Sequence, residues 1–539
     1  MRPKGRGDLE SLYFTYPHFD APTDRDERPC RTPVAIIGAG PVGMVAALAL
    51  AVEGVRSLLV DAKPTFNDGS RAICIARQSF YILDQVGALA PFLDKALGWT
   101  TGRSFYRGRQ ILEFHMPDSA HEKFRPMYNL QQQYIEAFLW QAVDANPLID
   151  ARWRTELVGV DQDAHAVRAM LRDPNGTYTV DADWLLAADG ARSRVRAARG
   201  LRLKGENYQG RYVIADVRMD HDYPTIRRAL FDPKSRPGGT VLVHRQPDDI
   251  WRIDYQLTPG ETSEDATRES AVRASVEAVL RDIDHTGDYD LEWWSVYSAN
   301  TLALEDYRDG RIFFIGDSAH IVPIFGVRGL NNGLADAQNI GWKLGHVLTG
   351  RAGAGLLDSY SPERRGATLD VFANAAKSTR FMTPPSHGWQ VLRDAALSLA
   401  LSQPFAGDLA NPRQMTPYIY DDSPLTAPDD PGFDHGPVPG MVAADPVVDD
   451  GYLSDRLRGV TLLVFGDTGG DLVDPSRWPG VQELRLPLRA AAAEAYDADD
   501  GTAYLIRPDM HVAARWKPAK AGDVTAALAR LLNREEVPA

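Results

Sequence analysis

The sequence predicts an α/β protein of the doubly wound type, with an antiparallel sheet inserted into it and a smaller α/β domain after it. Apolar strands alternate with helical patterns over residues 33–205 and again over 299–402, which is typical of a parallel sheet covered by helices. Between these stretches, over 206–298, short runs alternate apolar and polar residues, as antiparallel strands do. After a break in composition, strands and helices resume over 453–539.

Length and composition are those of a folded, multi-domain protein. At about 150 residues per domain, the 539 residues correspond to about three or four domains. The formal net charge of −14 argues against nucleic acid or a membrane surface as partner. The two cysteines, Cys30 and Cys74, are too few for a disulfide framework and lack the spacing of a metal or dithiol site, so we expect a cytoplasmic protein.

Val34–Val52 is an uncharged run of nineteen residues, close to the length of a membrane span. Glycines and a proline occupy its first half, and a polar, charged stretch precedes it. We therefore interpret this run as a buried strand, a tight turn and a buried helix, and expect no membrane segment.

Two further stretches lack periodicity. Residues 1–32 mix charge, proline and aromatic side chains, which indicates an extended arm on the surface, with a disordered leader as the alternative. Residues 403–452 are interpreted as a linker, because 421–452 contains eight Asp, six Pro and no Lys or Arg, a composition typical of a solvated, extended chain.

The first chemical motif is a glycine-rich turn after the first apolar strand. Gly38, Gly40 and Gly43 follow Val34–Ile37, and Asp61 ends the next strand, 23 positions after Gly38. A dinucleotide site needs one glycine for the turn, one for close approach of backbone to the pyrophosphate and one for helix packing, with an acid for the ribose. Strand, turn, helix and acid together predict such a site.

Two more strands end in acid and glycine. Asp189 and Gly190 follow the strand at 185–188, and Gly316 and Asp317 follow the strand at 312–315. A glycine-rich segment, 326–333, then opens another helix. Two strand ends and a second helix N-terminus suit a long cofactor whose halves contact different strand ends.

These three motifs, in this order and spacing, resemble the class A flavoprotein monooxygenases, the FAD-dependent aromatic hydroxylases. The form Phe-Gly-x-Arg-Gly-Leu-Asn at 325–331 and the trailing domain resemble the phenol hydroxylase and 3-(3-hydroxyphenyl)propionate hydroxylase branch. The resemblance implies a fold like that of p-hydroxybenzoate hydroxylase, with an FAD-binding domain in two parts (33–205 and 299–402) and a substrate domain at 206–298. It also implies a tightly but non-covalently bound FAD, NADPH or NADH as a transient co-substrate, and hydroxylation of a phenolic aromatic by O2 through a flavin C4a-hydroperoxide.

The resemblance also implies roles for individual residues. Gly38, Gly40 and Gly43 would hold the pyrophosphate and Asp61 the adenosine ribose. Arg71 and Gln132 match positions that contact FAD. Asp189 matches a position that is implicated in binding both FAD and the nicotinamide cofactor, and Asp317 would bind the ribityl chain. Pro323 would lie beside the isoalloxazine ring, and the backbone of Gly329, Leu330 and Asn331 would meet its pyrimidine edge, where a helix N-terminus favours negative charge.

The substrate would bind against the inserted sheet. Strand alternation separates Arg252, Asp254 and Gln256 from the residues between them, and we expect this polar set, together with His244, to line the pocket. The alternative is that this polar face meets water. A base that deprotonates the phenol is expected, with His244 and Tyr255 as candidates. For His320 a positioning role near the cofactor is favoured over a base, and Arg328 is either an anion-binding group or a charge at a helix start.

The remaining expectations concern the last domain and the alternatives. Residues 453–539 resemble a thioredoxin-like module without redox cysteines, so packing or homodimer formation is the expected role. No metal-binding motif is present. Two other functions stay open: a flavin-dependent halogenase, although its Gly-Trp-x-Trp-x-Ile-Pro segment is missing, and a non-catalytic FAD-binding protein.

Overall fold

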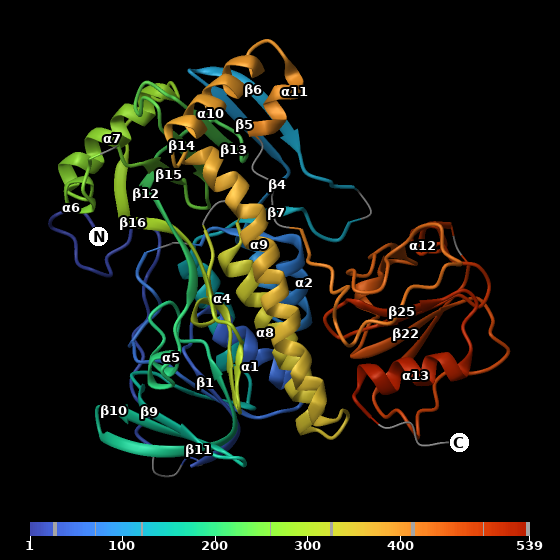
Figure 1. Ribbon diagram of the computed structural model, residues 1–539. Helices are drawn as coiled ribbons and strands as arrows, with labels where there is room; N and C mark the ends of the chain where they lie inside the picture. Colours follow the sequence, from blue (N-terminus) through green and yellow to red (C-terminus); the bar gives the residue numbers. More distant parts are fainter. Residues whose placement is uncertain are drawn as a thin grey trace.

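The computed structural model describes residues 1–24, 28, 30–69, 72–119, 122–258, 260–323, 327–410, 416–488 and 490–534. Two eight-stranded sheets and one four-stranded sheet organise these residues. In Figure 1 the first eight-stranded sheet lies at the bottom, the second lies toward the top, and the four-stranded sheet lies to one side, in orange and red. We call these parts the α/β core, the antiparallel domain and the C-terminal domain.

The α/β core is built on a sheet with the strand order β17-β18-β11-β1-β2-β8, to which β10 and β9 are added beside β11. Its strands are β1 (Arg31–Ile37), β2 (Ser57–Val60), β8 (Ile149–Arg152), β9 (Glu156–Gln162), β10 (Val167–Asp173), β11 (Gly176–Ala187), β17 (Arg308–Asp309) and β18 (Ile312–Phe314). β1 lies parallel to both β2 and β11. Residues 34–37 of β1 are all buried, which explains why this run is continuously apolar.

Six helices and a small sheet complete the α/β core within the described residues. The helices are α1 (Pro41–Val52), α2 (Arg77–Gln85), α3 (Ala90–Lys95), α4 (Gln132–Asp144), α5 (Arg194–Ala198) and α8 (Gly329–Leu348). The small sheet consists of β3 (Cys74–Ala76), β7 (Met127–Asn129) and β4 (Leu97–Trp99). The longer helix α9 (Tyr360–Met382) runs from this core toward the antiparallel domain (Figure 1).

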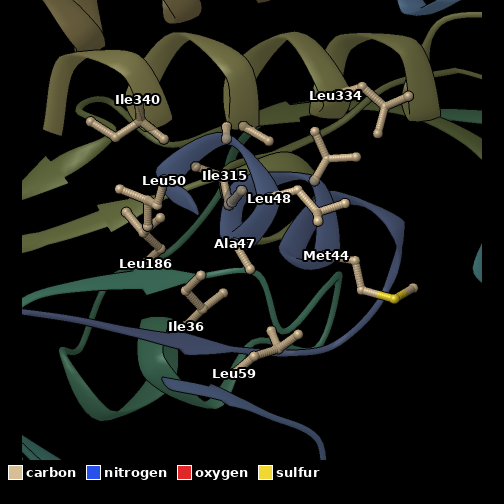
Figure 2. Packing of buried hydrophobic residues seen from close by; sticks show 14 of the residues in the cluster. Ile36, Met44, Ala47, Leu48, Leu50, Leu59, Leu186, Ile315, Leu334 and Ile340 are labelled. Carbon is tan, nitrogen blue, oxygen red and sulfur yellow. The ribbon is translucent and has the colours of Figure 1, made fainter. Parts of the chain in front are cut away.

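Helix α1 lies between the parallel strands and helix α8 (Figure 2). Ile36 and Leu59 contribute to this layer from the strands, and Leu334 and Ile340 contribute from α8 (Figure 2). Because both sides of α1 are covered, eight consecutive residues of the helix are buried and no polar face is needed. The uncharged run at 34–52 is therefore a buried strand, turn and helix, as predicted.

The antiparallel domain has the strand order β19-β16-β12-β15-β14-β13-β5-β6. Its strands are β5 (Thr101–Tyr106), β6 (Arg109–His115), β12 (Lys204–Arg218), β13 (Arg227–Phe231), β14 (Thr240–Arg245), β15 (Ile250–Gln256), β16 (Asp290–Ala303) and β19 (His320–Ile321). Helices α6 (Ser263–Ala266) and α7 (Glu269–Asp282) lie on one face, where their apolar residues pack against Trp251 and Ile253.

The expected boundaries of the inserted sheet, 206–298, therefore need correction. Strands β5 and β6 come from residues 101–115, which we assigned to the first α/β stretch, and β19 comes from the third motif. β5 joins the sheet by pairing in parallel with β13. Side chains alternate along each of these strands as in any strand. Which neighbouring strand each one pairs with depends on hydrogen bonds between segments far apart in the sequence, and local patterns do not reveal these.

The N-terminal arm is ordered over the described residues 1–24. Arg2 pairs with Glu292 of the antiparallel domain at 2.6 Å and with Asp68 of the α/β core at 2.8 Å. Phe19 stacks on Trp153 with the ring centroids 4.3 Å apart. The arm thus spans both domains in an irregular, extended conformation, and the alternative of a disordered leader does not describe these residues.

The stretch expected to be a solvated linker is partly buried, which corrects that prediction. Helix α10 (His387–Ala400) precedes it, and the short α11 (Pro404–Gly407) lies at its start. Tyr420 and Leu425 are only 3% and 5% exposed, and Asp429 pairs with Arg515 of the C-terminal domain. Composition misled here because it does not show that some of the few apolar residues, such as Tyr420 and Leu425, are buried.

The C-terminal domain has the strand order β23-β22-β24-β25. Its elements are β22 (Val460–Phe465), β23 (Val481–Leu486), α12 (Ala490–Ala495), β24 (Ala503–Ile506), β25 (Val512–Trp516) and α13 (Ala521–Leu531), preceded by the short pair β20 (Val447–Val448) and β21 (Gly451–Tyr452). β22 and β23 are parallel and the other pairs antiparallel. Among the described residues, no helix combines the length and the apolar composition that crossing a membrane requires.

A cluster of buried charges joins the C-terminal domain to α8 and α9. Glu363 accepts hydrogen bonds from Lys343 at 2.7 Å and from both terminal nitrogens of Arg507, at 2.7 and 2.9 Å. Arg507 also pairs with Asp509 at 2.7 Å, and all four side chains are almost fully buried. Burial raises the pKa of Glu363, but the charges of Arg507 and Lys343 outweigh this effect and hold that pKa well below its usual value.

Arg507→Ala should lower the free energy of unfolding by about 3–5 kcal/mol, because Glu363 and Asp509 would keep buried charges without their cation. Urea denaturation followed by tryptophan fluorescence measures this loss. The control is Arg485→Ala, which removes a more exposed ion pair with Glu483 in the same domain and should cost at most about 1 kcal/mol. Equal, small losses for both variants would contradict the structural role of the cluster.

Candidate functional site

The first glycine-rich turn forms a cradle between β1 and α1. Gly38 has a φ of +109°, and a Cβ there would overlap the backbone carbonyl of Ala188. A Cβ at Gly43 would overlap the carbonyl oxygen of Gly38, so α1 can only lie this close to the turn with glycine at that position. Gly40, which caps α1, faces open space, with no atom of the described residues within 4 Å of a Cβ. The turn thus leaves room for a group at the helix N-terminus.

Asp61 closes this turn from the next strand. Its carboxylate accepts hydrogen bonds from the backbone nitrogens of Ala39 and Lys63, each at 2.9 Å. The side chain is thereby held at the end of β2, beside the open cradle, where an acid can bind a ribose hydroxyl.

Asp189, at the end of β11, caps the following helix. Its Oδ2 accepts hydrogen bonds from the backbone nitrogens of Arg194 (2.7 Å) and Val195 (3.0 Å). Its Oδ1 is buried and has no hydrogen-bond partner among the described residues. Burial raises the pKa of Asp189 above its usual value. One oxygen is thus available to a ligand in the cavity described below.

The turn that carries Asp317 is fixed by a buried carboxylate, Asp336 of α8. Asp336 accepts a hydrogen bond from the backbone nitrogen of Gly316 at 2.9 Å and is paired with His320 at 2.7 Å and Arg364 at 2.7 Å. Burial raises the pKa of Asp336, but Arg364 and His320 lower it more, so it lies below the usual value. His320 is fully buried and is not part of the cavity lining. Its contact with Asp336 is that of a positioning group.

The N-terminus of α8 is held against the small sheet by Asn331. Its Oδ1 accepts hydrogen bonds from the Ala76 nitrogen (2.8 Å) and the Ser79 hydroxyl (2.7 Å), and its Nδ2 donates to the Val327 carbonyl (2.7 Å). With the side chain engaged in this way, the helix start itself faces the cavity, and its dipole favours negative charge there. Arg328 also lines the cavity, and burial lowers its pKa.

A cavity of about 620 Å³ connects these elements with the antiparallel domain. The motif residues that line it are Gly38, Gly40, Asp61, Gln132, Asp189, Asp317, Gly329, Leu330 and Asn331. From the antiparallel domain it is lined by Arg227, Leu242, His244, Arg252 and Asp254. The two predicted sites, one at the strand ends and one on the inserted sheet, are therefore parts of a single continuous cavity.

The polar face of β15 faces this cavity only in part. Arg252 and Asp254 line it, whereas Gln256, at the end of the strand, does not. Tyr255 points to the opposite face, where it packs with α7, and the Arg236 guanidinium lies 4.6 Å from its ring centre. Tyr255 therefore does not reach the cavity, which corrects its place as a candidate base, because adjacent residues of a strand face opposite sides of the sheet.

Three other predicted residues are placed differently or lie outside the described residues. Gly43 packs beneath the turn without lining the cavity. Pro323 is buried and is not part of the lining, although the preceding residue Val322 is. Arg71 falls on a position outside the described residues, so its predicted contact with FAD stays a prediction.

Sequence reasoning missed Arg227, which lines the cavity from β13 and is 4% exposed. Its Nε and Nη1 atoms have no hydrogen-bond partner among the described residues. One feature of the sequence could have indicated it: an arginine stands at the start of the apolar strand Arg227–Phe231. In the sheet, this position lies opposite a polar position of β14. Cys74, for which the sequence predicts no role in the site, also lines the cavity.

Comparison with known proteins places this geometry in a family. Residues 31–375 match the family described as FAD binding domain. The chain belongs to that family. The match ends within α9, so it includes all three motifs and the antiparallel domain, and leaves the C-terminal domain outside.

The chain is also similar to curated hydroxylases. It is 30% identical over 363 residues to the 3-(3-hydroxy-phenyl)propionate/3-hydroxycinnamic acid hydroxylase of Klebsiella pneumoniae strain 342, which is 67% of this chain and 64% of that protein. The matched stretch thus spans less than two thirds of that relative. The enzyme of the same name from Burkholderia cenocepacia is 27% identical over 94% of this chain and 97% of the relative.

Among solved structures, the flavin-dependent monooxygenase PieE in complex with FAD and substrate has a TM-score of 0.77 at 24% identity. The comparison covers 94% of this chain and 99% of PieE. At this level of identity the likeness concerns the fold, which extends through the C-terminal domain.

The residues at the cavity fit an FAD. Gly40 leaves space at a helix N-terminus where a pyrophosphate would lie, and Asp61 stands beside it. Asp317 and the start of α8 line the same cavity, and Oδ1 of Asp189, which has no hydrogen-bond partner among the described residues, provides an additional acceptor. The donors and acceptors are thus distributed along the cavity, as a dinucleotide with a long ribityl chain requires.

Gly40→Val should abolish FAD retention, because the isopropyl group would fill the space next to the α1 N-terminus. The yellow colour and the flavin-to-protein absorbance ratio of the purified protein measure the effect. Gly522→Val is a matched control, since Gly522 also faces open space but lies in the C-terminal domain, and it should retain full FAD. Full FAD in the Gly40 variant would contradict the assignment of the cradle.

Proposed function

We propose that the protein is an FAD-dependent hydroxylase that uses NADPH or NADH and O2 to add a hydroxyl group to a phenolic aromatic compound. The observation that carries the proposal is the single cavity in which a dinucleotide cradle opens onto buried polar side chains of the antiparallel domain. The related proteins from Klebsiella pneumoniae and Burkholderia cenocepacia are named as hydroxylases of 3-hydroxyphenyl compounds, which supports the same class of substrate.

The cofactor would be held mainly by backbone groups. The α1 N-terminus at Gly40 would bind the pyrophosphate, Asp61 the adenosine ribose and Asp317 the ribityl chain. The start of α8, at Gly329–Asn331, would stabilise negative charge on the reduced ring system. When bound, FAD supplies the hydride acceptance from NAD(P)H and the activation of O2 that the reaction needs.

The chain itself would bind and orient the aromatic substrate. Leu242 offers an apolar wall, and His244, Arg252 and Asp254 offer a few convergent polar groups, the combination expected for a small-molecule site. All four residues are at most 6% exposed, so water is largely excluded from this end of the cavity. Exclusion of water strengthens polar interactions with the substrate and limits the side reactions of reactive intermediates with water.

The test is NADPH and NADH oxidation by the purified FAD-containing protein in the presence of a panel of phenols. We expect slow oxidation alone, a large stimulation by at least one phenol, and a product heavier by one oxygen atom in mass spectrometry. A flavin that stays oxidised with excess NAD(P)H and every phenol would instead support a non-catalytic FAD-binding protein. A product that carries halogen only when halide is added would support a halogenase.

A further inference from the structure

The cavity-facing side of the antiparallel domain presents its polar groups in two adjacent rows. In the first row, His244 of β14 pairs with Arg252 of β15, which pairs with Asp216 of β12. Arg228 of β13 pairs with Val243 of β14, so the preceding residue Arg227 lies opposite His244 and extends this row. In the second row, Asp254 lies between Leu242 and Ile214. Residues two apart on a strand share a face, so Asp254 lies on the same side as this first row.

One pair in this cluster is already complete. Arg252 donates to both oxygens of Asp216, at 2.8 Å each, so the two charges neutralise one another. In contrast, Nε and Nη1 of Arg227, Nδ1 of His244 and Oδ1 of Asp254 have no hydrogen-bond partner among the described residues. Buried polar atoms are rarely left without partners, so these four atoms point to a ligand that satisfies them.

The environment of Asp254 contains several other titratable groups. They are Arg252 on its own strand, Asp216 and Tyr212 on β12, Tyr297 on β16, His244 on β14, Arg227 on β13 and Cys74 on β3. Burial keeps Cys74, Tyr212 and Tyr297 protonated by raising their pKa values. Asp254 therefore responds mainly to burial and to the three charges Arg252, Asp216 and Arg227.

These effects leave Asp254 able to change its protonation state near neutral pH. Burial raises its pKa, Arg252 lowers it, Asp216 raises it and Arg227 lowers it, with the result at about 7. When Asp254 is protonated, no carboxylate among the described residues is left to neutralise Arg227, because Asp216 is already paired with Arg252. The cluster then favours an anion in the cavity.

We propose that Asp254 accepts the proton of the substrate's phenolic hydroxyl and that Arg227 binds the resulting phenolate. This inference rests on the proposed function and assigns the base within it. The O–H bond of the phenol breaks, a new O–H bond forms at Oδ1 of Asp254, and the electron pair stays on the phenolate oxygen beside the Arg227 guanidinium. No electrons are exchanged in this step. The deprotonated ring is richer in electrons, which is what attack on an electrophilic oxygen requires.

His244 is the less suitable base, although it lines the same cavity. Burial lowers its pKa well below the usual value, and Arg227 and Arg252 lower it further. A proton on His244 would create a third buried cation beside two arginines, whereas a proton on Asp254 removes a buried charge. His244 is better suited to share a hydrogen bond with the substrate through Nδ1.

Ionisation of a bound phenol tests the inference without turnover. The probe is 3-methylphenol, an uncharged phenol whose hydroxyl ionises near pH 10, like that of tyrosine, so that about 1% is phenolate in solution at pH 8. Added to the wild-type FAD protein at pH 8, it should give the ultraviolet difference band of a phenolate. In Asp254→Asn the band should appear only as the pH approaches 10. In Arg227→Gln the band should shift to higher pH and the probe should bind more weakly.

Activity gives a second, independent readout. Since the base must be ionised to accept a proton, kcat/KM of the wild type should rise with pH through an apparent pKa near 7. Asp254→Asn should lose about 10²- to 10⁴-fold and recover toward high pH, where the phenol ionises by itself. Matched controls on the same sheet are Asp290→Asn and Arg218→Gln, an exposed pair that should leave both the profile and the band unchanged. FAD content verifies that each variant folds.

Three outcomes would overturn the inference while leaving the proposed function intact. One is a phenolate band or a rise in kcat/KM near pH 7 that persists in Asp254→Asn. Another is an Arg227→Gln variant that impairs only the carboxylated 3-(3-hydroxyphenyl)propionate and not 3-methylphenol, which would make Arg227 a carboxylate-binding residue. The third is a wild-type protein that turns over phenols but does not bind 3-methylphenol as the phenolate. Failure of every phenol to stimulate NAD(P)H oxidation would instead reject the proposed function.

Discussion

The buried ion pair between Asp336 and Arg364 holds together the parts on which the site depends. Asp336 also accepts the backbone hydrogen bond of Gly316, while Arg364 donates to the hydroxyl of Tyr420 at 2.8 Å. One set of hydrogen bonds therefore connects four parts of the chain. They are the end of β18, helix α8, helix α9 and the segment after α11. Such buried pairs contribute little net stability against an apolar alternative, but they impose geometry, since each partner left alone is costly. Here the imposed geometry places Asp317 at the cavity.

The cavity combines two kinds of recognition. At the strand ends of the α/β core, backbone groups and helix N-termini face it, which suits an anionic cofactor in a protein whose net charge is −14. On the antiparallel domain, buried side chains face it, and several of their polar atoms have no hydrogen-bond partner within the described part of the chain. The part of the cavity at the strand ends depends on glycines and tolerates few substitutions. The part on the antiparallel domain depends on which side chains are present. Differences in substrate among proteins of this fold are therefore expected to reside in the sheet.

Local motifs predicted most of the strand-end residues that line the cavity, because each motif carries its own geometry. Gly38, Gly40 and Asp61 lie within one strand-turn-helix-strand unit, so their spacing in the sequence fixes their spacing in space. The cavity lining on the antiparallel domain was predicted only by alternation, which found Arg252 and Asp254 but included Gln256 at the strand end. Alternation also could not reveal Arg227, since its place opposite His244 depends on how β13 and β14 pair. The linker prediction failed because composition does not show which side of a chain is covered.

The sequence by itself determined the doubly wound core, the glycine cradle with its acid, and the three strand ends that meet the cavity. These follow from short-range periodicity and from backbone conformations that few residues other than glycine adopt. The tertiary structure alone decided that β5 and β6 join the inserted sheet, that Tyr255 faces α7, and that Arg227 and Asp254 face the same cavity. The first feature depends on pairing between segments more than a hundred residues apart. The other two depend on which face of each strand packs against α7 and which face lines the cavity, and this is decided only when the whole core packs.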